Sequence, residues 1–273
     1  MFAAHARRLL DAGCAGVTPF GTTGEGPSFS VAERIAGADA IAREIPPERI
    51  LVSTSCASLE DVVELTRHAV SLGAWGCLLM PPFFHKQVSE QGVIDAYATV
   101  IDRVPDVRLM LYHLPQLSGV PLTHGVIATL LDRYPGTIVG LKDSGCELAT
   151  SLGFAEAFMD RMGVHVGNEA DLTALGRRGS AGAVSGIANF LPALVRRLVE
   201  RPDDAEAELA AVKRVIELAT SYPLTAALKG IMALVSGDKG WLGVRPPLVR
   251  LRENEFEALR KRWLSIDLGR TVQ

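Results

Sequence analysis

The sequence lacks paired cysteines and any strong excess of charge. Its four cysteines (Cys14, Cys56, Cys77 and Cys146) are scattered and form no CxxC pair, which argues against a zinc site and favours reduced thiols in the cytoplasm. Lysine plus arginine total 28 and aspartate plus glutamate 31, a net charge of −3. This balance argues against broad binding to nucleic acid or to an anionic membrane. We therefore expect a cytoplasmic protein that binds no metal.

Long hydrophobic runs are also missing. No stretch reaches the roughly 18–20 unbroken apolar residues of a membrane-spanning helix. The nearest approach, between Arg178 and Arg196, is interrupted by glycine, serine, asparagine and proline. The initial MFAAHARRLLDAG has the pattern of a short amphipathic helix and lacks the apolar centre of a secretory signal. Apolar residues nevertheless make up 48% of the chain, which supports a sizeable core and excludes a disordered chain.

Short apolar runs alternate with segments of helical period. Seven runs are expected to be strands: 15–21, 50–55, 76–81, 107–113, 137–143, 164–168 and 181–187. They are nearly continuous in apolar character, as in strands covered on both faces. Helices are expected behind the N-cap serines Ser30, Ser58 and Ser89, over 31–45, 59–73 and 90–104. This order predicts an α/β fold with a parallel sheet, either doubly wound or closed into a barrel.

In parallel α/β folds the chemistry lies at the carboxyl ends of the strands. Lys142 ends the run 137–143, where burial disfavours a charged amine, and a neutral amine attacks a ketone to form a Schiff base. The alternative is a lysine with a buried stem and a solvent-exposed head. Tyr112 ends the preceding run and could relay protons, or it could be a core tyrosine with a satisfied hydroxyl. We interpret the adjacent His113 as structural.

A glycine-rich loop, GTTGEG, follows the first run. Its backbone N–H groups and the hydroxyls of Thr22 and Thr23 suit a carboxylate or a phosphate. It is not a nucleotide-binding phosphate loop, because no Gly-Lys-Ser/Thr follows, and it does not match GxGxxG. The alternative is an ordinary turn between a strand and a helix.

Together the motifs GTTGE, YHLPQLSG, GLKDS, GNEAD and GAVSGIANFLP, in this order, resemble the dihydrodipicolinate synthase and N-acetylneuraminate lyase family from about residue 5 to 265. The resemblance implies a (β/α)8 TIM barrel over 1–200 and a C-terminal helical extension over 201–273. Members of that family begin with a strand, whereas this chain begins within the first helix. The resemblance thus implies a missing first strand and about 20–30 further residues upstream.

The resemblance also implies roles for individual residues. Lys142 corresponds to the Schiff-base lysine, Tyr112 to the proton-relay tyrosine, and Thr22 to a hydroxyl of that relay. Substrate contacts are implied for Thr23, which holds the pyruvate carboxylate, and for Val184, Gly167, Glu169 and Leu117. The implied substrates are pyruvate, or a 2-oxo acid that yields it, and an aldehyde. No cofactor is implied beyond the covalent imine, and a homodimer or homotetramer is expected.

Three positions depart from the family pattern. Leu117 stands where the synthases have an arginine that binds the aldehyde's carboxylate, which argues against lysine biosynthesis. Ala170 stands where sialic acid lyases have an acidic residue, and Phe84 replaces a second relay tyrosine and cannot pass a proton. The segments GTTGEGPSFS and SGIANFLP are most similar to those of 2-keto-3-deoxygluconate aldolases.

These observations favour a pyruvate-dependent aldolase acting on a 2-keto-3-deoxy sugar acid or a related hydroxy-2-oxo acid. Two alternatives keep the same lysine imine: a 4-hydroxy-tetrahydrodipicolinate (dihydrodipicolinate) synthase and a 2-keto-3-deoxy acid dehydratase. A third alternative is a homologue that binds a 2-oxo acid without catalysis.

Overall fold

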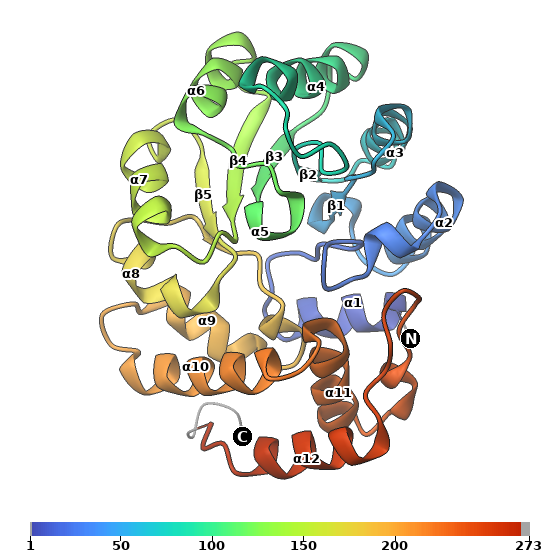
Figure 1. Ribbon diagram of the computed structural model, residues 1–273, viewed down its shortest axis with the longest axis vertical. Coiled ribbons are helices and arrows are strands. Elements are labelled where there is room, and N and C mark those ends of the chain that lie inside the picture. The colour runs from blue at the N-terminus through green and yellow to red at the C-terminus, as the bar shows by residue number, and fades with distance from the viewer. Residues whose placement is uncertain (1, 269–273) are drawn as a thin grey trace.

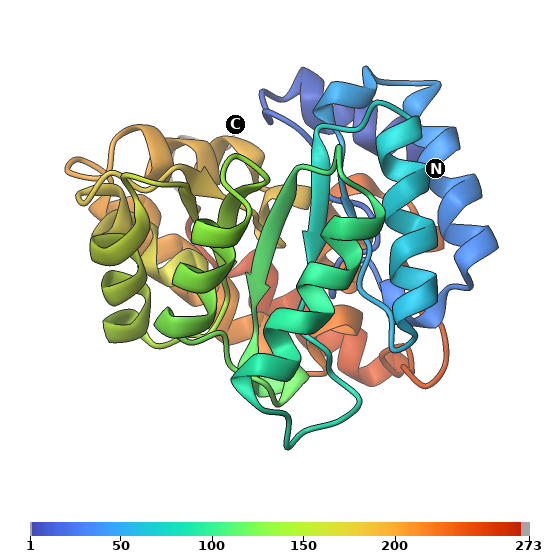
Figure 2. The same ribbon diagram turned by 90° about the horizontal axis from the view of Figure 1, so that it is seen from above.

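A computed structural model describes residues 2–268, which fold around a curled parallel sheet with helices along its outer side (Figures 1 and 2). The strands are β1 (Leu51–Ser53), β2 (Gly76–Leu79), β3 (Leu109–His113), β4 (Ile138–Asp143), β5 (Gly163–Val166) and β6 (Gly182–Ala183). They lie side by side in chain order, and each neighbouring pair is parallel. This confirms the predicted α/β class.

The helices that connect and cover the strands begin largely where the sequence predicts. They are α1 (Phe2–Asp11), α2 (Val31–Ala42), α3 (Leu59–Ser71), α4 (Glu90–Arg103), α5 (Pro115–Ser118), α6 (His124–Arg133), α7 (Leu148–Phe158), α8 (Leu172–Gly176), α9 (Pro192–Glu200), α10 (Glu206–Thr220), α11 (Leu224–Ser236) and α12 (Glu253–Leu264). The serines before α2, α3 and α4 each accept a hydrogen bond from a backbone N–H in the first turn, so all three predicted N-caps are confirmed.

The prediction of a strand over 15–21 was wrong. Within residues 2–268 this segment forms no regular strand. It makes a single parallel bridge, between Val17 and Ile50, and the Pro19 carbonyl accepts from the Ser53 N–H at 3.2 Å. Pro19 has no N–H to donate to a neighbouring strand, and Phe20 has a left-handed backbone with φ of 61°. The chain therefore leaves the sheet and turns into the GTTGEG loop.

The two faces of the sheet carry different side chains. On β3, Leu109 and Leu111 join the large cluster packed against the outer helices, whereas Met110 and Tyr112 belong to a smaller cluster. This smaller cluster contains Leu51, Leu78, Met110, Tyr112 and Leu114 and is called the inner cluster below. Because successive side chains of a strand point to opposite faces, the inner cluster marks the concave side of the sheet. Tyr112 thus faces the inside.

The helices after Pro202 share a core with α8 and α9. Leu194 of α9, Val215 of α10, Ile231 of α11 and Leu259 of α12 belong to one buried cluster. Within the described part of the chain, no single helix is long and apolar enough to cross a membrane. Helices α10 and α11 reach that length only as a pair bent by 119°, and both contribute to this core.

Candidate active site

Strand register brings the two residues with the clearest predicted chemistry together. Tyr112 on β3 is the register partner of Lys142 on β4, so both side chains lie on the inner face. The Lys142 Nζ lies 4.3 Å from the centre of the Tyr112 ring, within the range of a cation–π contact. Only 3% of Tyr112 is exposed to solvent. An amine thus lies beside a buried phenol at the carboxyl ends of the strands.

The GTTGEG loop reaches the same place. The Thr22 Oγ1 and the Tyr112 Oη are 3.2 Å apart, within hydrogen-bonding distance. The loop forms a tight turn in which the Glu25 N–H donates to the Thr22 carbonyl at 3.1 Å. The three residues predicted to be catalytic, Lys142, Tyr112 and Thr22, therefore form one continuous row of contacts in which a proton can pass between the two hydroxyls.

Gly167, directly after β5, gives the lysine its space. Its N–H donates to the Asp143 carbonyl at 2.7 Å, which draws the backbone against the end of β4. A Cβ at this position would lie 1.9 Å from the Ser144 Oγ and 3.0 Å from the Lys142 Cε. Any side chain larger than glycine would therefore push against the lysine stem. Gly167 therefore lies directly beside the Lys142 side chain.

Val184 and Thr23 lie where the loops at the two edges of the sheet approach one another. Val184 follows β6, donates its N–H to the Val166 carbonyl at 3.0 Å, and packs against the inner cluster. A Cβ on nearby Gly186 would lie 3.4 Å from the Thr23 Cγ2. The threonine turn and the loop after β6 are thus neighbours.

Glu169 is buried and holds the loop after β6. Its Oε1 accepts hydrogen bonds from the Ser185 hydroxyl at 2.6 Å and from the Ile187 N–H at 3.1 Å. The Ser185 Oγ in turn accepts from the Ala188 N–H at 3.0 Å. The structure therefore gives this carboxylate a part in shaping the loop, and its contact with substrate stays a prediction.

Leu117, in the short helix α5 after β3, and Phe84, in the loop after β2, are both exposed. Their exposed fractions are 58% and 72%. Lys86 joins the two segments by donating to the Ser118 carbonyl at 3.0 Å and to the Phe83 carbonyl. Contact of Leu117 with substrate likewise stays a prediction.

Sequence reasoning missed His165. It lies on β5 as the register partner of Lys142, and burial lowers the pKa of its imidazole, which favours the neutral ring. The position two residues before Gly167 on a strand could have indicated a side chain on the inner face. His113, in contrast, lies against Phe154 of α7 on the outer side, with ring centres 5.2 Å apart. The Leu122 N–H donates to its Nδ1 at 3.1 Å, in agreement with a structural role.

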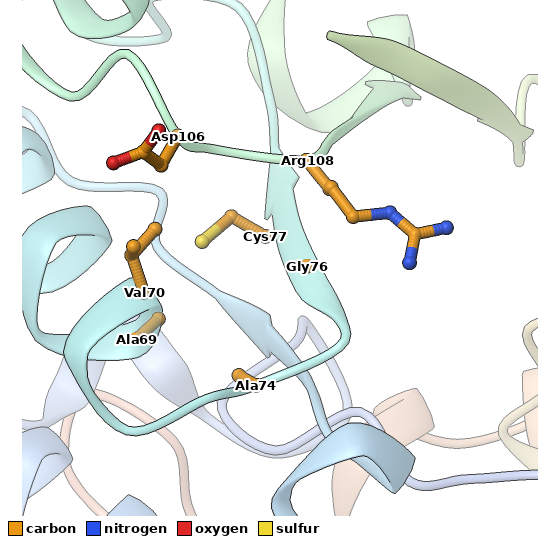
Figure 3. Close-up of a pocket in the computed structure, with 7 residues that line it drawn as sticks. All are labelled: Ala69, Val70, Ala74, Gly76, Cys77, Asp106 and Arg108. Carbon is orange, nitrogen blue, oxygen red and sulfur yellow. The ribbon is translucent and has the colours of Figure 1, made fainter. Parts of the chain in front are cut away.

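Two hollows lie away from this row of residues. One of about 100 Å³ adjoins the start of β2, where the Cys77 thiol points toward Val70 and Arg108 extends away (Figure 3). Burial raises the pKa of Cys77 to about 12, so this thiol stays protonated near neutral pH. The other, of about 540 Å³, lies outside the sheet and is lined by residues that include His113, His124 and Phe154. Neither hollow is lined by Lys142.

No cluster of three or more histidine, cysteine, aspartate or glutamate side chains within residues 2–268 is arranged to hold a metal ion. The reactive groups that the structure brings together are the amine of Lys142, the phenol of Tyr112 and the hydroxyl of Thr22. An amine held next to a proton-relaying phenol is suited to forming and breaking an imine with a carbonyl compound.

Comparison with known proteins shows the family to which the chain belongs. A sequence model of the dihydrodipicolinate synthetase family matches residues 2–264. A DapA-like lyase from Chloroflexus aurantiacus is 34% identical over 271 residues, which cover 98% of this chain and 90% of the relative.

Two solved structures share the fold over nearly the whole chain. Dihydrodipicolinate synthase from Agrobacterium tumefaciens superposes with a TM-score of 0.91 at 30% identity, covering 97% of this chain and 91% of that protein. YagE, a prophage protein of the dihydrodipicolinic acid synthase family from E. coli K12 solved in complex with pyruvate, gives a TM-score of 0.89 at 25% identity, covering 98% and 92%. The chain therefore belongs to the dihydrodipicolinate synthetase family of lyases and aldolases.

Proposed function

We propose that this carbon–carbon lyase is a class I, pyruvate-dependent aldolase that cleaves or forms a 2-keto-3-deoxy sugar acid or a related hydroxy-2-oxo acid. The observation that carries the proposal is the row Lys142, Tyr112 and Thr22, with the amine over the phenol ring and the phenol oxygen 3.2 Å from the threonine hydroxyl. The pyruvate complex of YagE supports a 2-oxo acid as the substrate.

The first step joins the substrate to the enzyme. The Lys142 Nζ attacks the C2 ketone, and the resulting carbinolamine loses water to give an imine. The hydroxyls and N–H groups of Thr22 and Thr23 hold the substrate carboxylate, so that C2 faces the amine. The family resemblance assigns the carbonyl of Val184 to face the imine, and the absence of a side chain at Gly167 leaves room for the adduct.

The second step breaks the carbon–carbon bond. Tyr112 gives its own proton to the hydroxyl that leaves the carbinolamine as water, which leaves an iminium on Lys142 and a phenolate on Tyr112. With Thr22 as its relay partner, the phenolate then takes the proton of the C4 hydroxyl, and the C3–C4 electron pair moves into the iminium. An aldehyde leaves, and an enamine of pyruvate remains on Lys142. Protonation at C3 and hydrolysis of the imine release pyruvate and regenerate the amine. Condensation follows the same steps in reverse, so the imine supplies the electron sink in either direction.

Product analysis tests this proposal. The protein is incubated with 2-keto-3-deoxygluconate, and the carbon skeletons of the products are identified by mass spectrometry, with Lys142→Ala as the matched control. An aldolase releases pyruvate and glyceraldehyde, and Lys142→Ala releases neither. A six-carbon dehydrated 2-oxo acid would instead identify a dehydratase, and cleavage that survives in Lys142→Ala would refute the mechanism.

A synthase is the second candidate, because the Agrobacterium tumefaciens synthase is 30% identical and superposes closely. Leu117 opposes it, because leucine offers no donor for the carboxylate of a second substrate. The two candidates differ in how they treat a charged aldehyde. We expect condensation of pyruvate with butanal to be at least as efficient as condensation with succinic semialdehyde. A strong preference for succinic semialdehyde would favour the synthase.

A further inference from the structure

We infer that the ion pair between Glu25 and Lys229 positions the Thr22–Thr23 turn for substrate, so that helix α11 acts on the active site from the far end of the chain. This inference rests on the proposed function and adds two positioning residues to it. Within the described residues, no hydrogen bond or ion pair joins Glu25 or Lys229 to Lys142 or Tyr112, so each acts through the turn.

Glu25 closes the turn in a backbone conformation that it would not adopt alone. Its φ is 56°, in the left-handed region that disfavours residues with a side chain. Such a conformation persists only where the surroundings enforce it. Glu25 is only 6% exposed, and its N–H donates to the Thr22 carbonyl at 3.1 Å. The carboxylate contacts of Glu25 therefore help to enforce the turn that the backbone hydrogen bonds of Glu25 to Thr22 and of Gly26 to Gly21 close.

Both carboxylate oxygens of Glu25 have partners that come from distant sequence. The Lys229 Nζ contacts Oε1, and the Arg245 N–H donates to Oε2 at 2.7 Å. The Lys229 side chain is 23% exposed, so this pair is much less solvated than a typical surface ion pair. Removal of the ammonium would leave a buried carboxylate without its counter-charge.

Helix α11 is a rigid support for this contact. Ala227 and Ile231, on either side of Lys229, are fully buried in the C-terminal core. The Leu228 Cδ1 lies 3.6 Å from the position a Cβ would take on Gly186, the residue that also adjoins Thr23. Two successive residues of α11 thus support the loops at both edges of the sheet.

Arg245 fixes the other side of the turn. Its guanidinium binds both carboxylate oxygens of Glu33 at 2.8 and 3.1 Å and lies 3.9 Å from the centre of the Phe29 ring. The backbone N–H that binds Glu25 is therefore itself held by residues that follow the loop. Glu25 lies where the threonine turn, α11 and the segment around Arg245 meet.

Loss of the ion pair should move Thr22 and Thr23 without removing any group that reacts. A displacement of about 1 Å at a positioning group can cost up to about 100-fold in rate. We expect Lys229→Met to raise the half-saturating pyruvate concentration for imine formation by about 10-fold or more, within that bound. The amount of imine at saturating pyruvate should stay close to that of the wild type, because Lys142 is untouched.

The experiment compares four variants with the wild type. Lys229→Met removes the charge, Lys229→Arg restores it, Glu25→Gln removes the opposite charge, and Lys261→Met makes the same substitution at an exposed position of α12. Borohydride trapping on Lys142 over a range of pyruvate concentrations gives the half-saturating concentration for each. Hydrogen exchange of the peptide covering 20–29 reports the order of the turn independently of pyruvate.

The inference requires faster hydrogen exchange of 20–29 and a higher half-saturating pyruvate concentration in both Lys229→Met and Glu25→Gln. Both quantities should return toward the wild-type values in Lys229→Arg. Neither should change in Lys261→Met. A fifth variant that combines Glu25→Gln with Lys229→Met should be no worse than either single variant, because both substitutions remove the same interaction. The inference would be overturned by unchanged hydrogen exchange of 20–29 in Lys229→Met. It would also be overturned if Lys229→Met and Glu25→Gln lowered the melting temperature without raising the half-saturating pyruvate concentration. Failure of the wild type to form any adduct would instead overturn the proposed function, and exchange in 20–29 would then still decide whether the ion pair orders the turn.

Discussion

The centre of the sheet and its two edges place their active-site residues by different means. In the centre, Tyr112 and Lys142 are register partners on β3 and β4, so backbone hydrogen bonds determine where both side chains lie. At the edges, β6 has only two residues and the segment before the GTTGEG loop makes a single bridge at Val17. Backbone pairing therefore suffices to position a strand end, whereas the edge loops depend on buried side chains.

The two edges also differ from each other. One loop depends on Glu25, whose partners are the Lys229 ammonium and a backbone N–H. The other depends on Glu169, whose partners are the Ser185 hydroxyl and a backbone N–H. The buried Glu25 carboxylate is thus paired with a positive charge, whereas the buried Glu169 carboxylate accepts hydrogen bonds from neutral donors. Substitutions that remove charge but keep shape should separate the two.

The largest effect is expected in the centre. Tyr112→Phe keeps the ring over Lys142 and removes the hydroxyl 3.2 Å from Thr22. Loss of a general acid or base typically costs about 10²–10⁴-fold, so we expect kcat to fall by that amount. Steady-state kinetics gives kcat, and a thermal melt serves as the control for folding. A folded variant with unchanged kcat would remove Tyr112 from the relay.

Gly167→Ala tests how closely the centre is packed. The added methyl would meet the Ser144 Oγ and the Lys142 Cε, so we expect a cost of about 1–3 kcal/mol in the free energy of unfolding together with reduced imine formation. Urea unfolding and pyruvate trapping measure the two effects. Gly92→Ala is the matched control, because its methyl would find only the Ser89 Oγ, at 3.5 Å. Normal trapping in Gly167→Ala would show that the lysine stem has more space than the structure indicates.

Glu169→Gln tests whether charge or hydrogen bonding holds the loop after β6. A glutamine oxygen can accept from both Ser185 and Ile187, so we expect little change in the free energy of unfolding. Glu169→Ala leaves both donors without a partner and should cost about 1–3 kcal/mol. Denaturant unfolding of the two variants, beside Glu25→Gln, measures the difference. Equal losses for Glu169→Gln and Glu169→Ala would mean that the negative charge, and not hydrogen bonding, holds this edge.

The smallest effect concerns pH and the loop after β6. His5 of α1 contacts the Asn189 Oδ1 through its Nε2 at 2.8 Å, and Arg8 donates to its Nδ1 at 3.0 Å, an arrangement that needs a neutral ring. Burial lowers the pKa of His5 from its ordinary 6.5, an effect to which Arg8 adds and which the Asn189 hydrogen bond opposes. As the pH falls below 6.5, the ordinary pKa of a histidine, His5 takes up its proton in the unfolded chain before it does so in the folded one.

The free energy of unfolding should therefore fall as the pH drops below about 6.5, and His5 should contribute part of that fall. Because burial also lowers the pKa of His113 and His165, the His5 share is isolated by subtracting the pH profile of His5→Gln from that of the wild type. Identical slopes for the two proteins between pH 7 and 5 would contradict a titrating contact at this edge.

The predictions from sequence succeeded where local pattern and backbone register decide the outcome. The apolar runs ending in Tyr112 and Lys142 are strands, and the glycine-rich loop with Thr22 follows a short parallel bridge. The expectation of a full strand at 15–21 failed, because Pro19 and the left-handed Phe20 end the pairing early.

What the sequence could not reveal depends on residues far apart in the chain. Glu25 and Lys229 are separated by 204 positions, and nothing in the motif around either residue points to the other. The place of His165 beside Lys142 likewise follows from the register between β4 and β5, which no single run of residues contains.

The most direct test of the account is to trap the imine. The protein is incubated with pyruvate and sodium borohydride, and the intact mass and a peptide map are recorded. We expect one reduced pyruvate per chain, attached to Lys142. No adduct on a folded protein in excess pyruvate, or an adduct on another lysine, would contradict it.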